Sequence, residues 1–253
     1  MQELEPWLAK IRAGNAAFQE EIGSTKLSLF GMTSRLLAVP RILKKAISGS
    51  LESHPSTDLQ WPWLPRWPAL AAAPVHESRH HAWTECVKEA RNDIREELAG
   101  VKEAFARARY DSDLNPKQWN TYYFYLHGKA IKSHLAACPR TAEVLRQIPH
   151  NGLHVCFSAI EPGGSLHPHT GPTNASLTAH LGLANCAGAR LWVAGKMADY
   201  RDDEVLVFDD SFVHWVENGG TAIRYTLMIT FWHPELNPLE REFLRRVIQS
   251  VRQ

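Results

Sequence analysis

The stretch IRYTLMITFW, residues 223–232, decides the fold because two kinds of side chain alternate along it. Successive side chains of a β-strand point to opposite faces of the sheet. One face would carry the apolar set Ile223, Tyr225, Leu227, Ile229 and Phe231. The other face would carry the mixed set Arg224, Thr226, Met228 and Thr230. This pattern predicts a strand that packs against helices with its apolar face and lines a ligand cavity with the mixed one.

Similar short stretches surround this strand and predict a domain that is mainly β with flanking helices. They are HVCFSAI (154–160), SLTAHLGL (176–183), ARLWVA (189–194) and EVLVF (204–208). By the same alternation, Cys156 and Ser158 share a face of one strand, while Ser176, Thr178 and His180 share a face of another. Short strands with tight breaks are typical of a sandwich or jelly roll. We expect a barrel over about residues 119–232 that can hold a metal and a small anion.

Helices are predicted on both sides of this block. In residues 83–108, apolar side chains recur at steps of three and four and form the stripe Trp83, Val87, Ala90, Ile94, Leu98, Val101 and Phe105. A second helix is predicted over residues 141–148. The last begins at Asn237, where Asn-Pro-x-Glu offers an N-cap, a first-turn proline and a capping partner in Glu240. Its buried face would consist of Leu239, Phe243, Val247 and Val251.

The chain is expected to divide into an N-terminal helical and irregular extension, residues 1–82, and a jelly-roll domain with supporting helices, residues 83–253. Residues 27–47 mix apolar and basic positions, which suits peripheral contact with a membrane surface, docking of an acyl carrier, or packing of a helix pair on the domain. The stretch LQWPWLPRWPAL (59–70) has too many prolines for a helix or a central strand. Its tryptophans are expected to cover an apolar surface or border a substrate entrance.

Composition and motifs exclude several classes of protein. The 253 residues carry 28 basic and 27 acidic side chains, so the net charge of +1 gives no sign of a nucleic acid partner. Four cysteines are spread without a CxxC pair, which argues against a zinc ribbon. Without a signal pattern or an apolar run of about 20 residues, we expect a cytoplasmic chain with no transmembrane segment. No phosphate loop, nucleophile elbow or HExxH motif is present.

Two histidine segments carry the chemistry. HPHTGPTN (167–174) places His169 just before a strand, and DDSFVHWVEN (209–218) places His214 just after one. The stretches PHTGPTN (168–174), HLGL (180–183), EVLVFDDSFVH (204–214), IRYTLMITFWHPEL (223–236) and ACPRTAEVLRQIP (137–149) resemble the aspartyl/asparaginyl β-hydroxylase family. The motifs occur in the order of that family, and the resemblance covers roughly two-thirds of the chain.

The resemblance implies a double-stranded β-helix, which is a cupin-like jelly roll. It also implies an iron(II)- and 2-oxoglutarate-dependent dioxygenase that uses O₂ to hydroxylate an unactivated C–H bond, giving succinate and CO₂. By position, His169 and His214 resemble the iron ligands, and Arg224 resembles the residue that grips the distal carboxylate of 2-oxoglutarate. Ser158 and His180 fall where the family places further contacts to this co-substrate. Neutral imidazoles suit ferrous iron, and a guanidinium fork matches a carboxylate.

One ligand position departs from most non-haem iron oxygenases, which add a carboxylate to two histidines. Gly171 stands at that position, two residues after His169, and the family shows the same gap. Asp209 and Asp210 are candidates for a rescuing ligand, although DDSF is more simply interpreted as a turn that ends a strand. The gap would also admit a halide, so an iron-dependent halogenase is an alternative function.

A second departure is Thr178, which stands where many family members have an arginine. The loss of this charge argues against tight recognition of an acidic residue, although Arg190 is a candidate for supplying it from a neighbouring strand. The expected substrate is therefore a small molecule, a peptide or a carrier-bound group. A non-catalytic, cupin-like binding module is the other alternative, and the sequence does not indicate an oligomeric state.

The remaining histidines are interpreted as rim or structural residues. His167 forms an HxH pair with His169 and is expected at the rim of the site. Exposed or structural positions are expected for His76, His80, His81 and His154. His233 is expected to form a corner between a strand and a helix.

Overall fold

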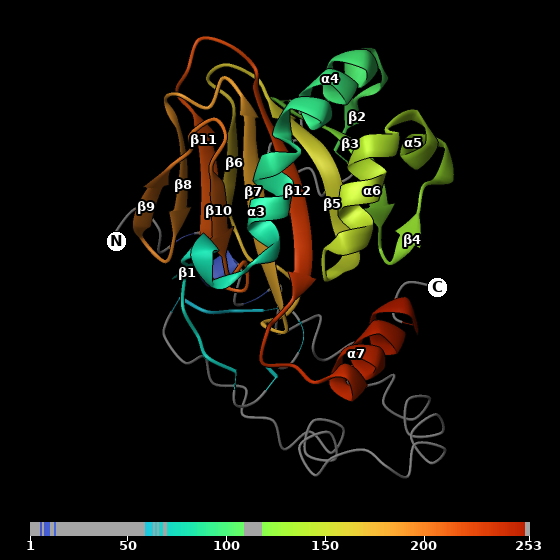
Figure 1. Ribbon diagram of the computed structural model, residues 1–253. Coiled ribbons are helices and arrows are strands. Elements are labelled where there is room, and N and C mark those ends of the chain that lie inside the picture. Colours follow the sequence, from blue (N-terminus) through green and yellow to red (C-terminus); the bar gives the residue numbers. More distant parts are fainter. Residues whose placement is uncertain are drawn as a thin grey trace.

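Two antiparallel β-sheets form the body of the protein, and helices cover the outside of the larger sheet (Figure 1). The structure is a computed structural model that describes residues 6, 8–10, 13, 59–62, 64, 66–67, 70–108 and 118–250, the last five as backbone only. Residues 27–47 and Val251 lie outside this description, as does the side chain of Val247, so the expectations for them stay predictions.

The larger sheet has eight strands. Their order is β1 (Val75–His76), β10 (Val205–Phe208), β7 (Ser176–Ala184), β12 (Arg224–Trp232), β5 (His150–Ile160), β3 (Trp119–Leu126) and β2 (Ala106–Arg107), with β4 (Lys129–Ala130) also paired to β3. The smaller sheet has four strands, in the order β6 (Ser165–His169), β11 (His214–Asn218), β8 (Ala189–Val193) and β9 (Lys196–Asp199).

The chain crosses repeatedly between the two sheets. It runs from β5 in the larger sheet to β6 in the smaller one and returns to β7 in the larger. It then forms β8 and β9 in the smaller sheet, β10 in the larger, β11 in the smaller and β12 in the larger. This connectivity confirms the predicted jelly roll. The five strands predicted from the sequence are present as β5, β7, β8, β10 and β12, whereas β6, β9 and β11 were not predicted individually.

The helices are α3 (Trp83–Glu89), α4 (Arg91–Val101), α5 (Lys132–Ala137), α6 (Pro139–Gln147) and α7 (Pro238–Ser250), with the short 3₁₀ helices η1 (Ser78–His80) and η2 (Lys102–Ala104). Figure 1 shows α3, α4 and α6 lying across the larger sheet, and buried residues of these helices share one core with it. Among the helices of the described residues, none combines the length and the hydropathy needed to cross a bilayer.

The alternation along 223–232 is confirmed. Leu227, Ile229 and Phe231 pack in the core between the larger sheet and the helices. The opposite face of β12 turns Arg224 and Met228 toward the space between the two sheets. Because each buried aliphatic or aromatic side chain contributes about 1.5–3 kcal/mol, the helix-facing side anchors the strand and leaves its other face available for polar groups.

The predicted helix over residues 83–108 is wrong in its continuity. The chain leaves helical geometry at Ala90, which has ψ of 1°. The Lys88 carbonyl there accepts a hydrogen bond from the Arg91 side chain. After η2 the chain becomes strand β2, because Ala106 and Arg107 pair with the edge of β3. The apolar stripe itself is confirmed, since its members all lie in or against the helix-side core.

The C-terminal helix begins as predicted. The Asn237 side chain accepts hydrogen bonds from the backbone N–H groups of Leu239 and Glu240, and Glu240 accepts one from the Asn237 N–H. The predicted buried face is wrong at Leu239, which is 64% exposed, and Leu244 is buried instead. Leu239 therefore points away from the core, and the buried stripe is rotated toward Phe243 and Leu244.

Candidate active site

A pocket lies between the two sheets and collects all five residues that the sequence analysis singled out. The larger sheet contributes Ser158, His180 and Arg224, and the smaller sheet contributes His169 and His214. The fold thus joins positions from five different strands, β5, β7, β12, β6 and β11.

His169 and His214 form a pair on adjacent strands. His169 is the last residue of β6, His214 is the first of β11, and the two are direct cross-strand partners. His169 precedes β7, as expected, and pairing with β11 makes it in addition the last residue of β6, a strand that was not predicted. The ring centroids lie 4.2 Å apart. Since a histidine nitrogen binds a metal at about 2 Å, two rings at this separation can share one ion.

Main-chain carbonyls orient both imidazole rings. The Nδ1 of His169 lies 2.7 Å from the carbonyl oxygen of His167, and the Nδ1 of His214 lies 2.9 Å from that of Phe212. A carbonyl oxygen only accepts, so each Nδ1 carries the hydrogen and each Nε2 keeps its lone pair. This tautomer is the one that a metal-binding histidine needs.

Burial keeps the pair neutral. Loss of solvation lowers the pKa of His169, with a smaller lowering from His167, and it lowers the pKa of His214 well below its usual value, with a further lowering from His169. A neutral imidazole retains the lone pair that coordinates a metal. Within the described ranges, no set of three or more His, Cys, Asp or Glu side chains is placed to hold a metal ion.

Gly171 faces the carboxyl group of Asp210. A Cβ atom at position 171 would lie within 2.6 Å of the Asp210 carboxyl oxygens, and the Gly171 N–H already donates to the Asp210 main-chain carbonyl. Asp210 thus occupies the space that a side chain at position 171 would need. No carboxylate ligand could stand at 171 without displacing it.

Asp209 and Asp210 are neighbours with different surroundings. Asp209 accepts hydrogen bonds from the N–H and hydroxyl of Ser211 and from Gln60, as expected for a turn that ends a strand. Asp210 instead accepts one from Thr178, while its Oδ1 is buried with no partner, and it lines the pocket. Both residues lie at the predicted turn, but the side chain of Asp210 faces the pocket and bonds Thr178. Burial, with a contribution from Asp209, raises the pKa of Asp210 to about 7.

Arg224 lies at the other side of the pocket and is 1% exposed. Its Nη1 donates to Thr226, its guanidinium lies 4.7 Å from the centre of the Tyr200 ring, and its Nε is buried without a partner. Within the described residues, Arg224 forms no ion pair with an aspartate or a glutamate. A buried cation with an unused donor is suited to an anion from solution.

His180 and Ser158 present further donors beside Arg224. His180 Nδ1 lies 2.7 Å from the Tyr200 hydroxyl, and its Nε2 is buried with no partner. The Ser158 oxygen accepts a hydrogen bond of 2.9 Å from the Trp119 indole N–H, which leaves the serine hydrogen available to donate. The sequence analysis singled out Ser158 and His180 but not Trp119 and Tyr200, the residues that bond them.

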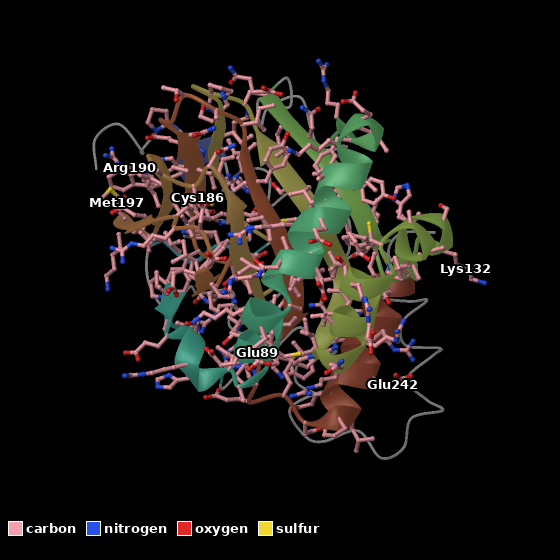
Figure 2. The ribbon with its side chains drawn as sticks, turned by 45° about the horizontal axis from the view of Figure 1, so that its top comes forward. Glu89, Lys132, Cys186, Arg190, Met197 and Glu242 are labelled. Carbon is pink, nitrogen blue, oxygen red and sulfur yellow. The ribbon has the colours of Figure 1, made fainter. Side chains whose placement is uncertain are left out.

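The charge that Thr178 lacks is not supplied by Arg190. Arg190 is exposed on the outer face of the smaller sheet and pairs with Asp199 of the neighbouring strand β9 at 3.7 Å (Figure 2). The suggestion that Arg190 serves the pocket is therefore wrong, because its position on β8 points to the outer face of the sheet. Among the described residues that line the pocket, Arg224 is the one permanent cation.

His154 lies in the pocket wall and corrects one interpretation. It is buried and lines the pocket near Thr230, whereas an exposed or structural position was expected. The signal was present, because the alternation that groups Cys156 with Ser158 extends to His154. By contrast, His76, His81 and His233 cluster away from the pocket. The ring centroid of His76 lies 6.2 Å from that of His81 and 6.2 Å from that of His233.

The residues present fit a ferrous ion and a keto acid. Two neutral imidazoles with lone pairs form a nitrogen site of the kind that Fe(II) accepts. The partnerless Nε of Arg224 and Nε2 of His180 are buried atoms that a carboxylate would satisfy. Both halves of the site line one pocket.

Comparison with known proteins identifies the family of the chain. The sequence profile of the family described as aspartyl/asparaginyl beta-hydroxylase matches residues 88–234. The human aspartyl/asparaginyl beta-hydroxylase is 30% identical over 186 residues, covering 69% of this chain and 24% of that protein. Aspartate beta-hydroxylase domain-containing protein 2 of Xenopus tropicalis is 29% identical over 203 residues, covering 75% of this chain and 54% of that protein. The chain thus spans between about a quarter and about half the length of these relatives.

Among solved structures, one similar chain is a prolyl hydroxylase from Trichoplax adhaerens in complex with a hypoxia inducible factor oxygen degradation domain peptide fragment. It aligns with a TM-score of 0.44 at 10% identity and covers 65% of this chain and 82% of that chain. The family profile spans the strands that carry His169, His214 and Arg224. The chain belongs to the aspartyl/asparaginyl β-hydroxylase family.

Proposed function

We propose that this chain is an Fe(II)- and 2-oxoglutarate-dependent dioxygenase that hydroxylates an unactivated C–H bond. One observation carries the proposal. Two neutral imidazoles, with lone pairs on Nε2, share a pocket with a buried guanidinium that has an unused donor. A metal site and an anion site side by side are what a chelating keto acid requires.

Each side chain has a defined role in this proposal. His169 and His214 would hold the iron through Nε2, and Arg224 would bind the distal carboxylate of 2-oxoglutarate with help from His180 and Ser158. When bound, the iron and 2-oxoglutarate supply an oxidation by O₂ in which one oxygen atom enters the C–H bond and the other enters succinate, with release of CO₂.

The walls of the pocket would keep water away from this chemistry. Leu166 and Val216 on the smaller sheet face Met228 on the larger one, and all three line the pocket. Apolar walls strengthen the attraction between the guanidinium and a carboxylate, because little water is present to screen it. They also limit the directions from which a substrate can approach.

The substrate group is proposed to be uncharged. Thr178, at the position of the family arginine, donates its hydroxyl to Asp210 rather than facing a substrate acid. Arg224 is committed to the co-substrate, and Arg190 lies outside the pocket. A free carboxylate on the substrate would meet Asp210 without a compensating cation, which opposes binding. A neutral part of a small molecule, a peptide or a carrier-bound group fits better.

Halogenation is the weaker alternative. It needs a halide beside the metal in the space next to Gly171, and the carboxyl group of Asp210 fills that space. Thr178 holds this carboxyl group in position through a 3.0 Å hydrogen bond. A halide would have to displace it and leave Thr178 without its partner.

The direct test is succinate formation from 2-oxoglutarate by the full chain with Fe(II) and O₂. Succinate above the enzyme-free background is expected, and it should be lost in His214→Ala but not in His80→Ala, a variant of an exposed histidine outside the pocket. A wild-type chain that forms no succinate would support a non-catalytic binding module. Added chloride should not change the rate, whereas a halogenase would respond to it.

A further inference from the structure

We infer that Tyr200 is a positioning residue for co-substrate binding. Its hydroxyl donates to Nδ1 of His180, which places the imidazole hydrogen on Nε2 and presents His180 to the carboxylate as a neutral donor. This inference rests on the proposed function for the identity of the anion, but the tautomer itself can be tested without any ligand.

Tyr200 is held rigidly beside the pocket. It follows β9 directly, is 3% exposed, and its N–H donates to the carbonyl of Ala189. Its ring is nearly parallel to that of His180, at an interplanar angle of 16°, and its hydroxyl oxygen lies 2.7 Å from His180 Nδ1. The hydroxyl therefore has little freedom to choose another partner.

The direction of this hydrogen bond follows from Arg224. The guanidinium of Arg224 lies over the Tyr200 ring, 4.7 Å from its centre, and its positive charge acts on the Tyr200 hydroxyl. A cation attracts the lone pairs of the hydroxyl oxygen and repels its hydrogen, which favours donation of that hydrogen to His180 Nδ1. With Nδ1 acting as acceptor, the neutral imidazole carries its hydrogen on Nε2.

The opposite tautomer would disturb two buried groups. If His180 carried the hydrogen on Nδ1, it would donate to the hydroxyl, and the tyrosine hydrogen would have no acceptor. The Nε2 lone pair would then face the same anion that Arg224 attracts, and two acceptors repel each other. The tautomer with Nε2–H satisfies every one of these atoms except Nε2 itself, which remains for a ligand.

His180 stays neutral in this arrangement. Burial lowers its pKa to about 3, and the charge of Arg224 lowers it further in the same direction. His180 therefore contributes a donor without a second positive charge. The Nε2 of His180 and the Nε of Arg224 are both buried, both partnerless, and both in groups that line the pocket.

A structural role for Tyr200 is the competing explanation, because its ring packs in the core between the sheets, together with Phe208 and Cys186. Tyr200→Phe separates the structural role from the positioning role, since it keeps the ring and removes only the hydroxyl. His180→Gln provides the second arm. The glutamine amide can donate regardless of Tyr200, so the hydroxyl should no longer matter in that background.

The first measurement is calorimetric binding of 2-oxoglutarate to the full chain loaded with Mn(II), which avoids turnover. Tyr200→Phe should weaken binding roughly five- to tenfold, as expected for loss of one oriented hydrogen bond, and leave Mn(II) affinity unchanged. Tyr225→Phe, on the helix-facing side of β12, is the matched control and should bind as wild type. In the His180→Gln background, Tyr200→Phe should have no further effect.

The second measurement is the ¹⁵N NMR signature of the His180 ring in the ligand-free protein. Wild type should show the Nε2–H tautomer, and Tyr200→Phe should show a mixture. Wild-type affinity in Tyr200→Phe, or an equal loss in the His180→Gln background, would overturn the inference. If the tautomer is as expected but wild type binds no 2-oxoglutarate, the positioning role stands and the proposed function fails instead.

Discussion

The two sides of the pocket orient their side chains by different means. On the smaller sheet, main-chain carbonyls two residues earlier in the chain bind the Nδ1 atoms of His169 and His214. On the larger sheet, side chains distant in sequence do the equivalent work, with Trp119 bonded to Ser158 across 39 positions and Tyr200 bonded to His180 across 20.

This difference separates a robust half of the site from a sensitive half. A carbonyl two residues away is present whatever side chain stands there, so the orientation of the histidine pair depends mainly on strand geometry. The donors on the larger sheet lose their orientation when one distant side chain changes. Substitutions around the pocket should therefore damage anion binding more readily than metal binding.

The largest effect is expected for His169→Ala or His214→Ala. Each removes one of two proposed ligands, and metal affinity should fall by more than about 100-fold, since loss of an outer partner alone typically costs about 10- to 100-fold. His167→Ala is the control that sharpens the comparison, because the hydrogen bond to His169 comes from the main-chain carbonyl of residue 167 and does not need the His167 side chain. Anaerobic titration with Fe(II) measures all three, and comparable losses in His167→Ala and His169→Ala would break the comparison.

Gly171→Ala probes the point where the two sides meet. The added Cβ would lie 2.4 Å from Asp210 Cγ, so we expect the free energy of unfolding to fall by about 1–3 kcal/mol, as for overpacking elsewhere. Asp210→Ala in the same chain should restore most of the loss by making room. Gly100→Ala, with nothing within 4 Å of its added Cβ and a place in α4, should be neutral or stabilising. Denaturant unfolding measures each variant, and a neutral Gly171→Ala would show that Asp210 moves freely.

The residues that line the pocket were easier to predict than those that orient them. The alternation along 223–232 placed Arg224 in the pocket, and the order of motifs singled out His169 and His214, all of which the structure brings together. Strand periodicity was enough for Arg224, whereas the two histidines came from the resemblance to the family. The exact strand ends were missed, as for His169, because pairing between β6 and β11 decides them.

Tyr200 and Trp119 could not be found in this way. Tyr200 stands in ADYRDDE, which resembles an ordinary turn, and its hydrogen bond to His180 exists only after β9 and β7 are brought together. The roles of Asp209 and Asp210 are likewise decided by tertiary contacts, since one faces Ser211 and the other faces Thr178. Tertiary contacts also ended the helix at Val101 in favour of strand β2.

The pH dependence of stability tests the neutrality of His180. The folded pKa is lowered to about 3, so as the pH falls below about 6.5 the unfolded chain gains a proton at His180 and the native protein does not. Its contribution to stability is therefore lost as the pH falls through this window. Between pH 7 and pH 5, wild type should lose about 2 kcal/mol relative to His180→Gln. Parallel unfolding curves for the two proteins would show that His180 is solvated or already charged.

The smallest effect is expected for Trp119→Phe. This change keeps an aromatic ring in the pocket wall but removes the indole N–H that donates to Ser158 at 2.9 Å. Ser158 would then be free to rotate and to turn its oxygen toward the co-substrate, so 2-oxoglutarate binding should weaken about threefold to tenfold. Metal affinity should not change, because the hydrogen bonds that orient His169 and His214 do not depend on Trp119. Calorimetry with 2-oxoglutarate and with Mn(II) on the same variant measures both quantities. If metal binding weakened as much as 2-oxoglutarate binding, orientation on the two sides of the pocket would be coupled, and the main-chain bonds to His169 and His214 would not be sufficient to hold the pair.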